Sequence, residues 1–139
     1  QRKQGWEDVL CEHRLEPSFN QWAEGDWLAE SGEFGFQKLC QNYPEMDAVF
    51  ISNDAMALGA MHYANSHGIR IPQDIAMIGF DDLPEAAFFT PSLSTVTHPL
   101  RELGKKSVRI LVEQIQNKSQ TYTNQTIMLD TGLVIREST

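Results

Sequence analysis

The stretch VFISNDAMALGAMHYANSHGIRIPQDIAMIGFDD, residues Val49–Asp82, contains the order of elements that decides the fold. It begins with a short apolar run rich in β-branched residues, which is typical of a strand buried on both faces. Apolar residues then recur at helical spacing over 55–66, and Gly68 follows as a helix stop. A second apolar run over 74–82 predicts another strand. Strand, helix and strand joined by short connections predict an open parallel sheet with helices on both faces, an α/β fold.

The rest of the chain continues this pattern. The sequence predicts further helices at 2–11, 31–41 and 99–117, and further strands near 21–23, 93–98 and 126–138. The long helix 99–117 carries apolar residues at helical spacing. We expect Asp54 and Ser31 to cap the helices that follow them.

Composition narrows the class of protein. The chain has 139 residues and a formal net charge of −8, with 41% hydrophobic and 22% charged residues, as in an ordinary globular domain. No run approaches the roughly 20 apolar residues of a membrane span, so we expect no membrane contact. The chain lacks the basic excess that a nucleic-acid surface needs. The spacing of Cys11 and Cys40 matches no metal site, and we expect free buried thiols, no metal and no cofactor.

Polar side chains appear where two successive strands end. Asn53 and Asp54 follow the first strand, and Asp81 and Asp82 end the second. In open α/β sheets, ligands bind beyond the carboxyl ends of the strands. Amide and carboxylate groups together donate and accept hydrogen bonds, which suits a ligand with many hydroxyl groups. Trp27, just after a Gly-Asp turn, could cover the apolar face of a sugar ring.

Five segments in order resemble one family of bacterial regulators. They are RKQGW (2–6), EGDW (24–27), the opening stretch (49–82), TPSLSTVTHPLRELGKKSVRILVEQI (90–115) and LVIREST (133–139). Together they resemble the effector-binding domain of the lactose-repressor/galactose-repressor (LacI/GalR) family and cover essentially the whole chain. Ser94 stands where threonine is commoner. Since the chain also begins without Met, we expect it to be a C-terminal fragment that lacks the DNA-binding headpiece.

The resemblance implies a fold and a domain division. The family's sensor is of the type I periplasmic-binding-protein-like kind, with two α/β lobes and a ligand cleft between them. Residues 1–95 and 126–139 would form the second lobe, and the helix 99–117 would belong to the first. That helix would then need another partner for its apolar stripe, in this chain or in a second copy.

The resemblance also assigns the effector site. Arg2, Trp27, Asn53 and Asp81 would contact a sugar or other small-molecule effector. His98 lies where the chain crosses between lobes, and is either a cleft residue or an exposed hinge residue. Asp54 and Asp82 are interpreted as caps and supporting groups.

The family's mechanism implies the partners. Effector binding would change the operator affinity of a cytoplasmic homodimer, which would contact operator DNA through the headpiece and not through this chain. The expected dimer surface comprises Leu58, Met61, His62, Phe88 and Phe89. Alternatively, Leu58 and Met61 simply face the sheet.

Two other functions compete. A periplasmic sugar-binding protein of a transporter or chemoreceptor would share the fold, and the sequence upstream of this chain would distinguish it by a signal peptide. An enzyme is the third possibility. The sequence contains no glycine-rich nucleotide motif and no nucleophile elbow, so we expect no catalytic residues.

Overall fold

The computed structural model describes residues 2–116 and 126–139. In chain order, the elements are α1 (Arg2–Glu12), η1 (Phe19–Gln21), α2 (Ala29–Asn42), β1 (Ala48–Phe50), α3 (Asp54–Ser66), β2 (Ala76–Asp81), η2 (Pro84–Phe88), β3 (Ser94–Thr97), α4 (Leu100–Gln116) and β4 (Gly132–Val134). The predicted α/β class is confirmed.

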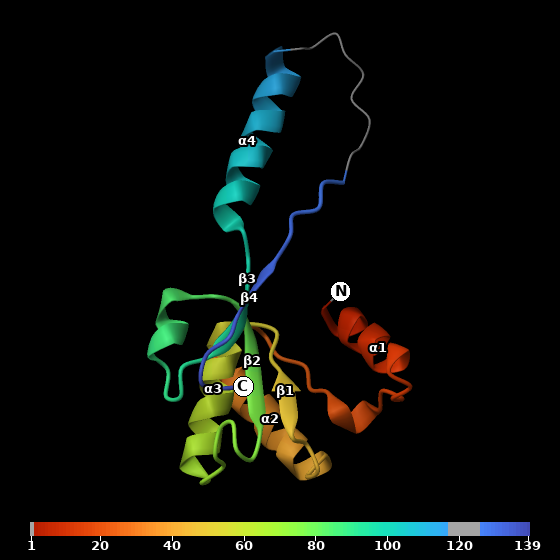
Figure 1. Cartoon of the computed structure of the whole chain (residues 1–139), viewed down its shortest axis with the longest axis vertical. Helices are drawn as coiled ribbons and strands as arrows, with labels where there is room; N and C mark the ends of the chain where they lie inside the picture. Colours follow the sequence, from red (N-terminus) through yellow and green to blue (C-terminus); the bar gives the residue numbers. More distant parts are fainter. Residues whose placement is uncertain (1, 117–125) are drawn as a thin grey trace.

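The four strands form one sheet in the order β1-β2-β3-β4 (Figure 1). The first three strands are parallel, as expected. The last strand runs antiparallel to β3, so the expectation of a wholly parallel sheet is wrong at this edge. The reason is the path of the chain, because β3 leads toward α4 and β4 leads back from it (Figure 1).

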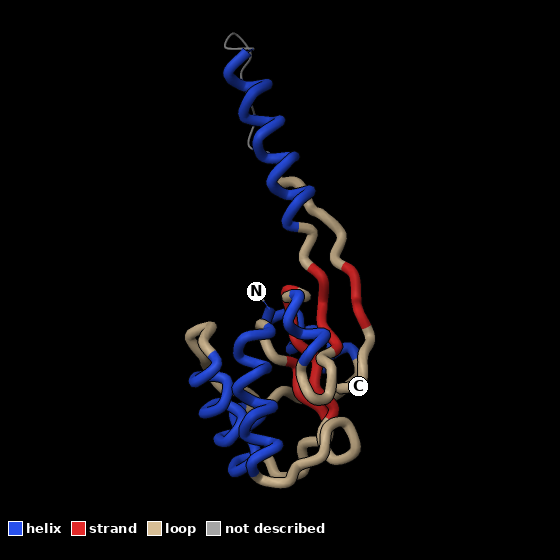
Figure 2. The backbone as a smooth tube through the Cα atoms, turned by 90° about the vertical axis from the view of Figure 1, so that its left-hand side faces the viewer, coloured by secondary structure: helices blue, strands red, loops and turns tan. Residues whose placement is uncertain are grey.

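Helices lie on both faces of the sheet. On one side, α2 and α3 pack together against the strands (Figure 2). The core between these layers is made of apolar side chains with at most 9% exposure: Phe36, Leu39, Met46, Ile51, Ala57, Ala60, Met61, Ala64, Ile71, Ile75, Met77, Ala86 and Leu93. On the other side, α1 and the side chains of Phe50 and Phe80 line an open hollow.

Two glycines let α2 and α3 cross at very short distance. A Cβ atom on Gly32 would lie 2.0 Å from the carbonyl oxygen of Met56, and one on Gly59 would lie 1.8 Å from that of Ala29. Real Cβ atoms essentially never approach backbone so closely. The crossing therefore depends on backbone packed directly on backbone.

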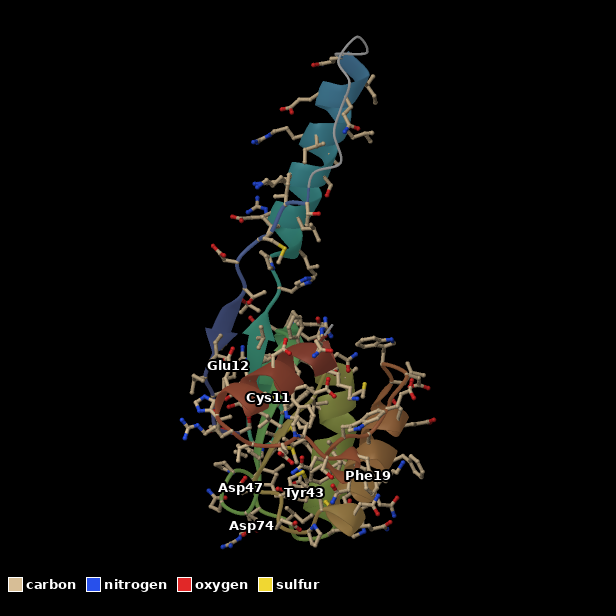
Figure 3. The ribbon with its side chains drawn as sticks, turned by 90° about the vertical axis from the view of Figure 1, so that its right-hand side faces the viewer. Cys11, Glu12, Phe19, Tyr43, Asp47 and Asp74 are labelled. Atoms are coloured by element: carbon tan, nitrogen blue, oxygen red, sulfur yellow. The ribbon has the colours of Figure 1, made fainter. Side chains whose placement is uncertain are left out.

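The helix α4 extends away from the sheet (Figures 1 and 3). None of its residues is buried. Its apolar stripe keeps exposures from 43% to 61% at Leu100, Leu103, Val108, Leu111, Val112 and Ile115. Within the described part of the chain, nothing covers this stripe. The predicted last residue of the helix, Asn117, lies outside the described residues.

The C-terminal tail is fastened to the sheet through one buried hydroxyl. Ser138 is 0% exposed. Its Oγ donates to the carbonyl of Met77 at 2.6 Å and accepts from the N–H of Ser94 at 2.8 Å. The backbone of Ser138 also bonds Met77 and Ser92, at 2.8 and 3.0 Å. The tail thereby joins Met77, near the start of β2, to the start of β3.

Some local predictions were wrong. The strand expected near 21–23 is wrong. Gln21 ends η1, where its side chain accepts from the N–H of Ser18 at 2.9 Å and favours a turn. Trp22 has extended backbone angles but belongs to no strand. Ser31 lies inside α2, which begins at Ala29, and its hydroxyl bonds the preceding turn instead of capping the helix. Cys11, labelled in Figure 3, is exposed and free, so it is not the buried thiol that we expected.

No helix of the described residues is long and apolar enough to cross a membrane.

Candidate functional site

The site is organised around Arg2, at the start of α1. Its guanidinium group donates to the carbonyl of Ser52 and lies 3.7 Å from the Asp81 carboxylate. The same group lies 3.8 Å from the ring centre of Phe80 and 5.4 Å from that of Trp27. Four separate chain segments therefore converge where β1 and β2 end.

Asn53 connects this cluster to α3. Its side-chain oxygen accepts from the N–H of Met56 at 2.8 Å, and its amide nitrogen donates to the carbonyl of Trp27 at 3.0 Å. Asn53 is therefore the N-cap of α3, and the prediction that Asp54 caps this helix is wrong. An amide has two N–H donors and a carbonyl oxygen with two lone pairs, so Asn53 retains one of each for a ligand.

Trp27 presents its indole to solvent. The backbone of this residue has φ of +75°, and its carbonyl is held by the bond from Asn53. The residue is 58% exposed. A turn thus keeps a large aromatic face accessible beside Arg2, as a stacking role requires.

Asp54 is buried beneath the site. It is 0% exposed, and its two oxygens accept from the Thr95 hydroxyl at 2.6 Å and from the N–H of Leu83 at 2.8 Å. Burial raises the pKa of Asp54 above its ordinary value of 3.8, while these two hydrogen bonds oppose part of the shift. The charges of Asp81 and Asp82 raise it further.

This raised pKa predicts how the free energy of unfolding depends on pH. A carboxyl group whose pKa is higher in the folded state stabilises the fold below its unfolded pKa, and this stabilisation is lost as pH rises through the folded pKa. The Asp54→Asn variant cannot titrate at this position. We therefore expect the wild type to gain stability relative to Asp54→Asn as pH falls from 7 toward 4, measured by urea unfolding.

A matched control is Asp74→Asn, near the end of the sheet remote from α4 (Figure 3). Contact with Arg70 lowers the pKa of Asp74 to about 2. Its stabilising effect is present above the unfolded pKa and lost only in stronger acid. The difference in unfolding free energy between the wild type and Asp74→Asn should therefore stay constant between pH 7 and pH 5. A constant difference for Asp54→Asn as well would contradict the account of Asp54.

Asp82 is held from the opposite end of the chain. Its carboxylate forms an ion pair with Arg136 at 2.7 Å, and Arg136 also donates to the carbonyl of Leu93 at 2.7 Å. Leu83, not Asp82, occupies the N-cap position of η2. The interpretation of Asp82 as a cap is therefore wrong, because its side chain fastens the C-terminal tail.

His98 joins the cluster through an aromatic contact. Its ring centre lies 5.8 Å from that of Phe80, and the residue is exposed. All five residues expected at the effector site, Arg2, Trp27, Asn53, Asp81 and His98, are thus linked directly or through Phe80. Phe80 itself and the carbonyl of Ser52 were not expected at this site. A continuous apolar run gives no signal for which of its residues faces a site.

The surface expected to form a dimer is only partly exposed. Phe88 is 85% exposed and Leu58 46% exposed, and His62 is also exposed. Phe89 is partly buried against the core. Met61 is 2% exposed, so its expected place on this surface is wrong and its side chain belongs to the core.

The cluster combines one cation, one carboxylate, one amide and several aromatic faces. Hydroxyl groups of a ligand could donate to Asp81 and accept from Arg2 and Asn53. A ring could stack on Trp27. Among residues 2–116 and 126–139, no three His, Cys, Asp or Glu side chains are grouped as a metal site would require. The geometry is suited to binding a polar ligand that has apolar faces.

Comparison with known sequences gives the family. The family described as periplasmic binding protein-like domain matches residues 1–139. The ribose operon repressor of Haemophilus influenzae is 35% identical over 137 residues, which are 99% of this chain and 41% of that protein. The HTH-type transcriptional repressor PurR of Edwardsiella ictaluri is 36% identical, with 99% and 40% covered. The chain thus spans about two fifths of the length of these relatives.

The solved structures that resemble this chain are also transcriptional regulators. A transcriptional regulator CelR–cellobiose complex superposes with a TM-score of 0.92 at 31% identity, covering 99% of this chain and 41% of that one. The Lac repressor bound to ONPG superposes with a TM-score of 0.80 at 35% identity, with 99% and 40% covered. The chain therefore belongs to the periplasmic binding protein-like domain family, in the form found in LacI-type transcriptional regulators.

Proposed function

We propose that this chain is part of the effector-sensing region of a LacI-type transcriptional regulator. A sugar or a similar small metabolite binds at the cluster around Arg2 and changes the affinity of a homodimer for operator DNA. The observation that carries this proposal is the convergence of Arg2, Trp27 and Asp81 at the carboxyl ends of β1 and β2. This is the edge at which open α/β sheets bind ligands.

Each residue has a distinct role in this proposal. Asp81 accepts hydrogen bonds from hydroxyl groups, and Arg2 donates to hydroxyl or anionic oxygens. Trp27 stacks on the ring, and Asn53 supplies its remaining donor and acceptor. His98 lines the cleft beside Phe80, at the point where the chain leaves β3 for α4.

The site is completed by a second lobe in the complete protein. Residues 1–95 and 126–139 form one lobe, and the helix of 99–117 packs into the other. The exposed apolar stripe of α4 supports this division, because an isolated helix with such a stripe needs a partner. Effector binding then shifts the population between two arrangements of the lobes.

The relatives favour a regulator over a transporter component. Two are named as repressors, and the CelR and Lac repressor structures hold cellobiose and ONPG. The proposal therefore places the protein in the cytoplasm, with operator DNA bound by a part of the protein outside this chain. It includes no catalytic step.

The test uses the complete protein, with D-ribose, cellobiose, sucrose and ONPG as probes. We expect at least one probe to give saturable heat in calorimetry and to change the migration of an operator fragment in the presence of the protein. Binding without any effect on DNA would favour the periplasmic alternative. Turnover of a probe would favour an enzyme.

We further propose that α3 and η2 form the homodimer surface. Leu58 and His62 lie four residues apart on one helical face, and the Asn65 side chain donates to the carbonyl of Thr90 at 3.2 Å, which keeps η2 beside α3. Phe88, at 85% exposure, supplies the largest apolar side chain. Homodimers commonly pair through a two-fold contact, in which each subunit uses the same patch.

The Phe88→Lys variant tests this surface. A charge in the buried centre of an apolar interface is costly, so we expect dimer dissociation to become at least about tenfold more favourable. Sedimentation over a range of concentrations measures it. Phe34→Lys is the matched control, because Phe34 is also exposed, at 67%, but lies on α2. Equal dimerisation of Phe88→Lys and Phe34→Lys would exclude this surface.

A further inference from the structure

The turn that follows β2 has an unusual backbone. Asp81 has φ of +110° and Asp82 has φ of +53°. L-residues rarely adopt positive φ, and two in succession persist only where the surroundings hold them. The direction of the Asp81 carboxylate therefore depends on whatever fixes this turn.

The side chain of Asp81 is too weakly held to fix the turn. Its ion pair with Arg2 is 3.7 Å long, and both side chains are 31% exposed. Ion pairs of this length and exposure contribute little. Arg136 binds the carboxylate of Asp82. The backbone N–H groups of the turn still need hydrogen-bond acceptors of their own.

Asp54 and Thr95 supply these acceptors. The Thr95 hydroxyl donates to Asp54 at 2.6 Å and accepts from the N–H of Asp82 at 3.3 Å. The second oxygen of Asp54 accepts from the N–H of Leu83 at 2.8 Å. Both N–H groups that follow Asp81 in the chain are thus held by one buried pair.

Gly79 leaves room for this pair. A Cβ atom there would lie 2.3 Å from Oδ1 of Asp54. The carboxylate therefore reaches Thr95 in β3 across a strand position without a side chain. The sequence elements that produce the arrangement are Asp54 at the start of α3, Gly79 within β2 and Thr95 within β3.

We propose that Asp54 is a positioning residue of the effector site, whose buried carboxylate holds the turn Asp81–Leu83 so that Asp81 faces Arg2 and the ligand. The inference rests on the proposed function, since it concerns how a residue of the same site is positioned. Asp54 does not touch the effector, and its influence on binding passes through Asp81.

The test compares two variants that each remove one buried hydroxyl. Thr95→Val keeps the shape of the side chain but removes the link between Asp54 and Asp82. Ser138→Ala also removes a hydroxyl that is 0% exposed and bridges two backbone groups, but its partners lie along β2 and β3. Both variants should be less stable than the wild type. Amide hydrogen exchange should become faster at Asp82 and Leu83 in Thr95→Val only.

The readout that separates positioning from stability is a double-mutant cycle with Asp81→Asn. The ligand is whichever of D-ribose, cellobiose, sucrose and ONPG binds the complete protein most tightly. Thr95→Val should weaken this binding by about threefold to tenfold in the wild-type background, as expected for residues coupled through shared contacts. In the Asp81→Asn background the same change should have almost no further effect. Ser138→Ala should leave affinity per folded molecule unchanged.

The outcomes distinguish the two claims. If Asp81→Asn weakens binding but Thr95→Val weakens it equally in both backgrounds, the positioning role is wrong and the effector site stands. If Asp82 and Leu83 exchange at unchanged rates in Thr95→Val, the positioning role is also wrong. If no probe binds, or if Asp81→Asn binds as well as the wild type, the proposed site is wrong and the positioning role falls with it.

Discussion

The Gly59→Ala variant is expected to lose about 3 kcal/mol of unfolding free energy, the upper part of the usual cost of overpacking. The new Cβ would lie 1.8 Å from the carbonyl oxygen of Ala29 and 2.9 Å from the N–H of Glu33. Both atoms are backbone, so no side chain can rotate away. Alanine is the better helix former by about 1 kcal/mol, but the helices must separate to accommodate it.

Urea unfolding of Gly59→Ala and Gly5→Ala measures this effect. Gly5 lies within α1, and nothing lies within 4 Å of a Cβ at that position. Gly5→Ala should therefore gain about 0.5–1 kcal/mol from helix propensity alone. If both variants were stabilised, the close crossing of α2 and α3 would be wrong.

The Asp81→Ala variant is expected to bind the effector about tenfold to a hundredfold more weakly. Loss of a hydrogen bond to a charged group costs about 1.5–3 kcal/mol. The change also frees Arg2 from its partner at 3.7 Å, so part of the loss reflects a less ordered guanidinium group. Calorimetry with the complete protein and its tightest probe measures the affinity.

Asp81→Asn distinguishes the effect of losing the charge from the effect of straining the backbone. Asparagine tolerates positive φ better than alanine and keeps one acceptor, so its loss of affinity should be smaller than that of Asp81→Ala. Circular dichroism and a melting curve of each variant show whether the fold is retained. Wild-type affinity in a folded Asp81→Ala would remove this residue from the site.

The sequence predicted the fold well because its apolar residues form clear strand runs and recur at helical spacing in the helices. The apolar runs of β1 and β2 and the helix between them follow the expected order. The expectation that β1 is buried on both faces is wrong, because β1 is an edge strand in which Ala48 and Phe50 are exposed. The failures occur where tertiary contacts override local signals. Met61 shares its spacing with exposed residues of α3 but faces the sheet. The direction of β4 depends on the path through α4, which no local pattern encodes.

The site was predictable to the level of strand ends but not of individual roles. Side chains at the ends of neighbouring parallel strands must meet at one edge, and Asn53 and Asp81 do so. Which of two adjacent polar residues faces the site depends on backbone angles. Asn53 caps α3 and faces Trp27, whereas Asp54 turns inward to Thr95. Local preference alone assigned the cap to the wrong residue.

The central claim is that a ligand binds on the exposed face of Trp27, beside Arg2 and Asp81. Its most direct test is a fluorescence titration of the complete protein in which Trp27 is the only tryptophan of this chain. Trp6→Phe and Trp22→Phe provide this variant, and any tryptophan outside the chain is likewise replaced by phenylalanine. Addition of D-ribose, cellobiose, sucrose or ONPG should produce a saturable change in Trp27 emission for at least one sugar. In Asp81→Ala the same change should require about tenfold to a hundredfold more probe. Binding seen by calorimetry without any change in Trp27 emission would contradict this account.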